Sequence, residues 1–208
     1  MLCTHKNYLF LFLILFSSAY INSEDNPFLF IDSNAQKMVT ILTENSDLFS
    51  SDRVLYENKI KEIFEPMIDF KRVAASVMGK KYYLLSTSTQ REDFAEIFKD
   101  SLLDTYAETL AQWGDSRIST HFSNIQINDQ IKSIEVKQTL NTGSSKYPIS
   151  YKLRKSKDGW KIVNIIINGV NLGLTFRNQF QALAISNNDD IESTLNNWVS
   201  DAGDAGIS

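Results

Sequence analysis

The chain has 208 residues, and its 21 Lys or Arg against 25 Asp or Glu give a formal net charge of −4. This mildly acidic balance argues against a nucleic-acid-binding surface, which requires clustered basic side chains. With 43% hydrophobic residues, 3 prolines and 8 glycines, the sequence is typical of a folded protein and not of a disordered or repetitive one.

The N-terminus is expected to be a signal peptide. Lys6 supplies a positive charge, an unbroken apolar run covers residues 8–16, and small residues follow at 17–19. The run is far shorter than the roughly 20 residues that a membrane-spanning helix requires. We therefore expect export, with cleavage after Ala19 or as late as residue 23.

Cys3, the one cysteine in the sequence, precedes the apolar run and would leave with the signal peptide. The mature chain would then have no thiol, no disulfide and no cysteine metal ligand. Removal of residues 1–19 takes away one lysine and no acid, so the formal charge becomes −5. Residues 20–208 are expected to form a single domain, with a helical part at about 26–114 and a sheet with closing helices at about 115–200.

The first half of the mature chain carries helical patterns. Asn26 followed by proline is typical of a helix start, and apolar residues then recur every three or four positions as far as Leu42. A second apolar stripe covers residues 56–67, where Pro66 is expected to bend or end the helix. Both stripes predict amphipathic helices.

Two more helices follow. Asp69 can cap a short third helix, which Gly79 is expected to end. Thr87 and Gln90 have the spacing of a capping box, so a long helix is predicted to begin there and to close at Gly114.

After Gly114 the apolar period changes from helical spacing to alternation. Residues 134–140 and 147–153 alternate apolar and polar side chains, which predicts two half-buried strands. Residues 160–167 are apolar nearly throughout, as in a strand covered on both sides. A less regular strand is expected over 118–127.

Helical spacing returns at 172–183 and 191–198, with a cap expected within 187–190. The predicted fold class is therefore α+β: N-terminal helices packed on an antiparallel sheet of about four strands, with closing C-terminal helices.

The sequence lacks the motifs of common enzymes. It has no G-x-S-x-G elbow, H-E-x-x-H helix or G-x-x-x-x-G-K-[ST] phosphate loop, and His121 is the one histidine outside the expected signal peptide. Acid pairs such as Glu92-Asp93 and Asp189-Asp190 fall at expected helix starts, where the helix dipole favours them. We expect no catalytic residues and no metal, although the sequence leaves open a carboxylate dyad assembled from distant segments.

Large apolar side chains are in surplus on the long helix, on the strands and on the helix from Leu172. A filled hydrophobic core accounts for such a surplus, and so does a core with an apolar pocket. Periodicity does not distinguish the two.

The segment Pro66-Met67-Ile68-Asp69-Phe70, followed by Val77-Met78-Gly79, resembles the P-x-(V/I)-D-F…(V/L)-(L/M)-G signature of the MlaC family, periplasmic phospholipid-binding proteins also known for toluene tolerance. Other family-like marks occur in the family's order at Asn26-Pro27-Phe28, Thr87-Ser88-Thr89-Gln90-Arg91 with Phe94, Trp160-Lys161-Ile162, Gly169-Val170-Asn171-Leu172, and Arg177 with Phe180. The sequence departs from the pattern at Asn164, where the family usually has an acid, at Asn171, where it usually has serine, and at Asn187-Asn188, where a glycine is expected.

The resemblance implies a curved sheet of the nuclear-transport-factor-two-like or cystatin-like kind, with phospholipid acyl chains held between sheet and helices and no other cofactor. On this basis Arg177 is a candidate contact for the head group or a partner, with a surface salt bridge as the alternative. The residues expected to line the lipid pocket are Val73, Val77, Phe98, Leu102, Tyr106, Ile134, Val136, Tyr151, Leu153, Val170, Leu174 and Phe176.

The resemblance also implies a periplasmic carrier that helps to maintain outer-membrane lipid asymmetry. Its partners would be an outer-membrane lipoprotein complex and an inner-membrane ABC transporter with its membrane-tethered substrate-binding subunit. The alternatives are an exported enzyme on the same cone-shaped fold, or a structural domain with a filled core. The enzyme requires an inward strand carboxylate, whereas alternation places Glu135 opposite to Ile134 and Val136, on the outer face.

Overall fold

The structure, a computed structural model, describes residues 25–111 and 116–201, without the side chains of 103–111. The expected signal peptide and the expected helix end at Gly114 lie outside the described residues. The helices are α1 (Pro27–Glu44), α2 (Leu48–Ser51), α3 (Arg53–Met67), α4 (Phe70–Leu85), α5 (Ser88–Ala111), α6 (Leu172–Ser186) and α7 (Ile191–Asn196). The strands are β1 (Arg117–His121), β2 (Ser133–Asn141), β3 (Lys146–Ser156), β4 (Gly159–Ile167) and β5 (Val170–Asn171).

The strands form one antiparallel sheet in the order β1-β2-β3-β4-β5, so each strand pairs with its neighbour in the chain. The α+β class, with helices before and after an antiparallel sheet, is confirmed; the fifth strand is the two-residue β5. The strand expected over 118–127 is shorter than predicted. Pairing ends at His121, and the chain continues as a loop in which Phe122 and Ile125 are exposed.

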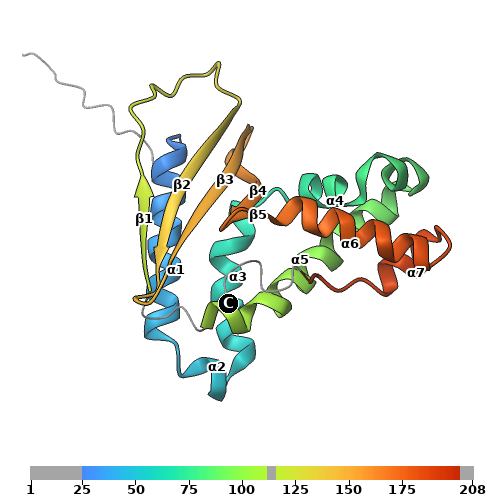
Figure 1. Ribbon diagram of the computed structural model, residues 1–208, viewed down its shortest axis with the longest axis horizontal. Coiled ribbons are helices and arrows are strands. Elements are labelled where there is room, and N and C mark those ends of the chain that lie inside the picture. Colours follow the sequence, from blue (N-terminus) through green and yellow to red (C-terminus); the bar gives the residue numbers. More distant parts are fainter. Residues whose placement is uncertain (1–24, 112–115, 202–208) are drawn as a thin grey trace, which may run out of the picture.

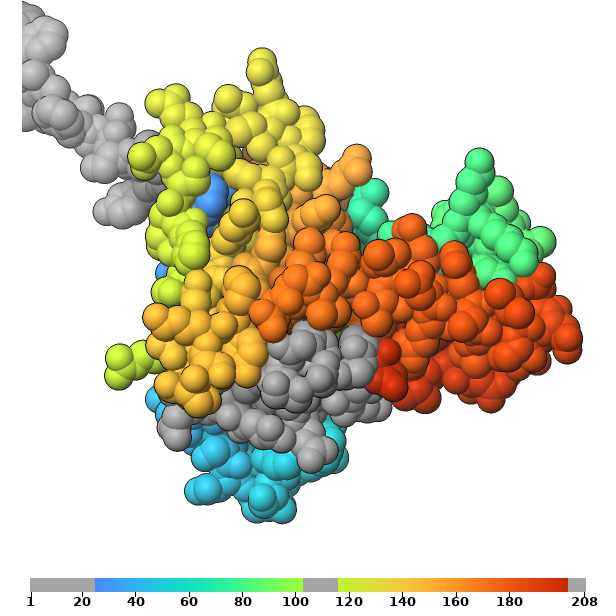
Figure 2. All heavy atoms as spheres, in the orientation of Figure 1, coloured from blue at the N-terminus to red at the C-terminus, as the bar shows by residue number. Residues whose placement is uncertain are grey.

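The helices form two groups around the sheet (Figure 1). Helix α1 packs against β1 and β2, and α3 packs against β4. Helices α4, α5, α6 and α7 pack on one another beside the sheet. In the space-filling view this second group projects sideways from the strands (Figure 2).

The described residues form four hydrophobic clusters, and the two largest belong one to each group. The sheet core lies between the strands and helices α1 and α3, and it is built from buried residues such as Phe28, Val136 and Trp160. The helical core lies within α4 to α7 and the segment that follows, and it includes Phe94, Phe98, Phe176, Phe180 and Trp198. Half-buried Phe70 and Val73, at the start of α4, pack against both cores and so join the two groups.

The sequence signals for helix starts are confirmed. The Asn26 side chain accepts a hydrogen bond from the backbone N–H of Phe28 at 2.9 Å. In the capping box, the backbone N–H of Gln90 donates to Thr87 Oγ1 at 3.2 Å, and the backbone N–H of Thr87 donates to Gln90 Oε1 at 3.0 Å. Asp190 caps α7 through the backbone N–H of Ser193 at 2.7 Å. These bonds satisfy N–H groups that have no partner within a helix.

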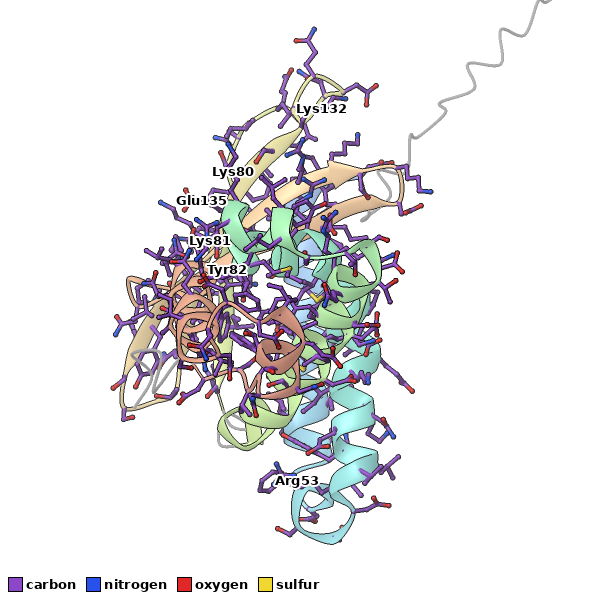
Figure 3. All side chains as sticks on the ribbon, turned by 90° about the vertical axis from the view of Figure 1, so that its right-hand side faces the viewer. Arg53, Lys80, Lys81, Tyr82, Lys132 and Glu135 are labelled. Atoms are coloured by element: carbon purple, nitrogen blue, oxygen red, sulfur yellow. The ribbon has the colours of Figure 1, made fainter. Side chains whose placement is uncertain are left out.

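The prediction that Gly79 interrupts the helix is confirmed, because the backbone at Gly79 is non-helical, with φ of 69° and ψ of 170°. The sequence did not predict the second helical segment, which follows this kink directly and completes α4 as far as Leu85. The second half of α4 is held to the α6–α7 turn by Asp189, which accepts hydrogen bonds from Lys81 Nζ and Tyr82 Oη, each at 2.7 Å. Figure 3 shows Lys81 and Tyr82 together on this part of α4. The Lys81 bond lowers the pKa of Asp189, and the Asp189 bond raises the pKa of Lys81.

Replacing Gly79 with alanine is expected to destabilise the fold by about 1–3 kcal/mol, because this combination of φ and ψ is accessible almost solely to glycine. The added Cβ would also lie 3.3 Å from Nε2 of Gln181. Urea denaturation measures the loss. Lys80→Ala, at the exposed neighbouring position, should change the free energy of unfolding by less than about 0.5 kcal/mol. Equal stability of Gly79→Ala and the wild type would contradict the kinked backbone.

Candidate functional site

An apolar cavity of about 190 Å³ lies where the sheet meets the helices. It is larger than the engineered cavity of roughly 150 Å³ that stays dry and binds benzene. Helix α1 contributes Ile31, Asn34, Ala35, Met38, Val39 and Leu42; the α3–α4 region contributes Phe64, Met67, Ile68, Phe70 and Val73; α5 contributes Phe98 and Leu102. The strands contribute Ile118, Leu140, Ile149, Tyr151, Ile162, Asn164, Ile165 and Ile167, and α6 contributes Leu172, Gly173 and Phe176.

The lining is suited to hydrocarbon. None of its residues is charged, and its polar side chains are Asn34, Asn164 and Tyr151. Apolar walls with few polar groups are typical of sites for apolar or amphipathic small molecules. The Tyr151 phenol is neutral at physiological pH, as tyrosine ordinarily is, and burial raises its pKa further.

Five of the twelve residues expected to contact lipid line this cavity: Val73, Phe98, Leu102, Tyr151 and Phe176. They come from two helical segments of the first half, from the middle of β3 and from α6. The structure therefore brings together residues that lie more than 100 positions apart in the sequence.

The other expected residues lie elsewhere or are not described. Val77 is buried in the helical core, and Ile134, Val136 and Leu153 pack in the sheet core. Val170 is half-buried on β5, Leu174 is 51% exposed, and the side chain of Tyr106 lies outside the described residues.

Sequence reasoning missed the contribution of α1, which supplies six of the lining residues. The apolar stripe of this helix was visible, and it contains Ile31, Ala35, Met38 and Leu42 at spacings of three and four. The alanine in the middle of that stripe is the available signal, because a small side chain at a core-facing position leaves space beside it.

The described residues offer little for acid–base or metal chemistry. Glu135 is exposed on the outer face of the sheet, where it accepts a hydrogen bond from Ser150 Oγ, as expected from alternation (Figure 3). His121 is exposed, and its Nε2 lies 2.9 Å from Thr139 Oγ1. Within 25–111 and 116–201, no three His, Cys, Asp or Glu residues come together as a possible metal site.

The described helices also include none that is both long enough and apolar enough to cross a bilayer.

The family described as MlaC protein matches residues 32–200, which is most of the chain. This chain belongs to the MlaC family. It is 27% identical over 175 residues to the toluene tolerance protein ttg2D of Pseudomonas putida, covering 84% of this chain and 80% of that protein. It is 21% identical over 187 residues to the intermembrane phospholipid transport system binding protein MlaC of Haemophilus influenzae, covering 89% of this chain and 78% of that protein.

A solved structure shares the MlaC fold of this chain. It is the phospholipid-binding protein of Ralstonia solanacearum in complex with a phospholipid, with a TM-score of 0.71 at 23% identity. The match covers 80% of this chain and 91% of the other.

Two departures from the MlaC pattern meet at one hydrogen bond. Asn164 Nδ2 donates to Asn171 Oδ1 at 3.0 Å, and that same oxygen caps α6 by accepting from the backbone N–H of Leu174 at 3.1 Å. Asn164 Oδ1 accepts from the backbone N–H of Gly173 at 3.1 Å. A Cβ on Gly173 would lie 2.5 Å from that oxygen, so any larger residue here would force the Asn164 side chain to move and would disturb this hydrogen bond beside the cavity.

Arg177, from the R-x-x-F part of the MlaC-like sequence, contacts α4 and does not line the cavity. Its Nε donates to the Ser76 carbonyl at 2.7 Å, and its Nη2 donates to Ser76 Oγ at 2.9 Å. These bonds satisfy a carbonyl next to the Gly79 kink. A head-group or partner contact by Arg177 stays a prediction.

Proposed function

We propose that this chain is a periplasmic phospholipid carrier, which holds acyl chains in the apolar cavity and carries lipid between outer-membrane and inner-membrane complexes. The observation that supports it is a cavity without charged lining residues in a member of the MlaC family. The Haemophilus influenzae relative is named for intermembrane phospholipid transport, and the Ralstonia solanacearum protein was solved with a phospholipid bound.

The energetics explain why such a carrier needs a cavity. Burial of one methylene is worth about 0.8 kcal/mol, so a phospholipid with roughly 30 methylenes faces a cost on the order of 20 kcal/mol on entering water. A protein that replaces water around the acyl chains removes most of that cost. The charged head group can stay hydrated at the protein surface.

Directional transport has to come from partners, since the sequence has no phosphate-loop motif for ATP hydrolysis. The partners in this proposal are an outer-membrane lipoprotein complex and an inner-membrane ABC transporter with its membrane-tethered substrate-binding subunit. Residues 1–19 would direct export to the compartment between the two membranes.

The experiment is to purify the protein from the periplasm of a Gram-negative host, extract it with organic solvent and analyse the extract by mass spectrometry. We expect about one phospholipid per chain, because the described cavity is a single apolar site. Lipid-stripped protein should then take labelled phospholipid from donor vesicles and deliver it to acceptor vesicles. A protein that purifies without lipid and takes up none from vesicles would rule out the carrier and favour a structural domain.

A further inference from the structure

Of the three polar side chains that line the cavity, Tyr151 is the one that makes no hydrogen bond at all to the described residues. Of its polar lining residues, Asn34 donates from Nδ2 to the Phe30 carbonyl at 2.8 Å, and Asn164 uses both amide atoms in the turn to α6. The Tyr151 hydroxyl has no hydrogen-bond partner among the described residues.

The Tyr151 hydroxyl differs from the hydroxyl of Tyr56, which also has no partner within the described part of the chain but is fully buried. Tyr56 is 0% exposed in a cluster between α1 and α3, and its oxygen is sealed from any ligand. Tyr151 packs against the sheet core yet keeps part of its surface accessible, and its oxygen is not among the sealed ones. Because Tyr151 lines the cavity, we infer that its accessible surface faces the space where a ligand would lie.

A hydroxyl in an apolar site is costly when it stays without an acceptor. Acyl chains offer no acceptor along their length, whereas the ester carbonyl that joins each chain to glycerol is a strong one. A tyrosine phenol is protonated at neutral pH, so its O–H is available to donate.

We propose that the Tyr151 hydroxyl donates a hydrogen bond to an ester carbonyl of the bound phospholipid, so that the cavity prefers ester-linked over ether-linked lipids. This inference rests on the proposed carrier function and adds to it a residue that distinguishes classes of lipid. The position of Tyr151 is fixed by the sheet, where it pairs with Val136 on one side and Ile165 on the other. The donor is therefore held on a rigid strand and not on a loop.

The test compares two phosphatidylethanolamines of equal chain length, one diacyl and one diether, binding to the lipid-stripped full chain in a competition assay. Wild type should bind the diacyl lipid about fivefold more tightly, which corresponds to one net hydrogen bond of about 1 kcal/mol. Tyr151→Phe should bind the diacyl lipid about fivefold less tightly than wild type does and should bind the diether lipid unchanged. The preference for ester linkage would then disappear.

Tyr56→Phe is the matched control, because it removes a buried hydroxyl that does not line the cavity and should leave both affinities unchanged. Tyr151→Phe keeps the ring and breaks no bond among the described residues, so its thermal midpoint should stay near that of wild type. Equal binding of both lipids by wild type, or an equal loss of both in Tyr151→Phe, would overturn the ester contact and leave the carrier standing. Failure of wild type to bind either lipid would overturn the carrier function itself.

Discussion

Replacing Ala35 with tryptophan is expected to abolish lipid binding in a chain that still folds. Ala35 lines the cavity from the middle of α1, so an indole ring at this position would occupy much of the 190 Å³ that lipid needs. The cost to stability is that of overpacking, about 1–3 kcal/mol. Phospholipid recovered per chain by mass spectrometry should fall by at least about tenfold, while circular dichroism should still show a cooperative thermal transition.

Ala182→Trp makes the same chemical change at an exposed position on α6, away from the cavity, and should retain lipid at the wild-type level. Should Ala35→Trp lower stability too far, Val39→Phe on the same face of α1 adds a smaller ring to the lining. Wild-type lipid content in both folded variants would show that lipid binds elsewhere.

Replacing Phe94 with alanine is expected to lower the free energy of unfolding by about 3–5 kcal/mol, the largest stability loss that we predict for a single side chain. Phe94 is 0% exposed at the centre of the helical core. Its ring centroid lies 4.8 Å from that of Phe180, 5.4 Å from that of Trp198 and 6.0 Å from that of Phe98. Aromatic pairs at such distances and tilts add to the energy of burial. Guanidinium denaturation at equilibrium measures the change.

Phe122→Ala removes the same side chain from the loop after β1, where it is 59% exposed, and should cost about 1 kcal/mol or less. A loss below about 1.5 kcal/mol in Phe94→Ala would mean that the rings repack around the space left behind, and it would contradict the rigid helical core described above.

The features of the fold that were predicted correctly from the sequence are those that depend on interactions between residues close together in the chain. A capping box or an Asn-Pro start joins residues within one helical turn, so the signals at Asn26 and Thr87 were sufficient. Alternation likewise placed Glu135 on the outer face of the sheet. The break at Gly79 was predicted, but the helical segment after it was missed because distant partners hold it: Asp189 bonds the second half of α4, and Arg177 bonds the carbonyl of Ser76.

The candidate site was predicted only in part for the same reason. Tyr151 and Leu153 point to the same face of β3, yet one lines the cavity and the other is packed in the sheet core. Alternation identifies the inner face, but the helices opposite decide where that face meets empty space. The hydrogen bond between Asn164 and Asn171 was not predictable for a similar reason. In the sequence each asparagine is a separate departure from the family pattern, and only the fold brings the two side chains together.

The division into two cores gives the molecule two separate optical reporters. Trp160, 1% exposed, belongs to the sheet core, and Trp198, 5% exposed, belongs to the helical core. In a variant that keeps one of these two tryptophans and replaces the other tryptophans, tryptophan fluorescence reports on one half of the molecule alone. The wavelength of maximum emission then shows which half unfolds first, in the presence or absence of bound lipid. No attached dye is needed.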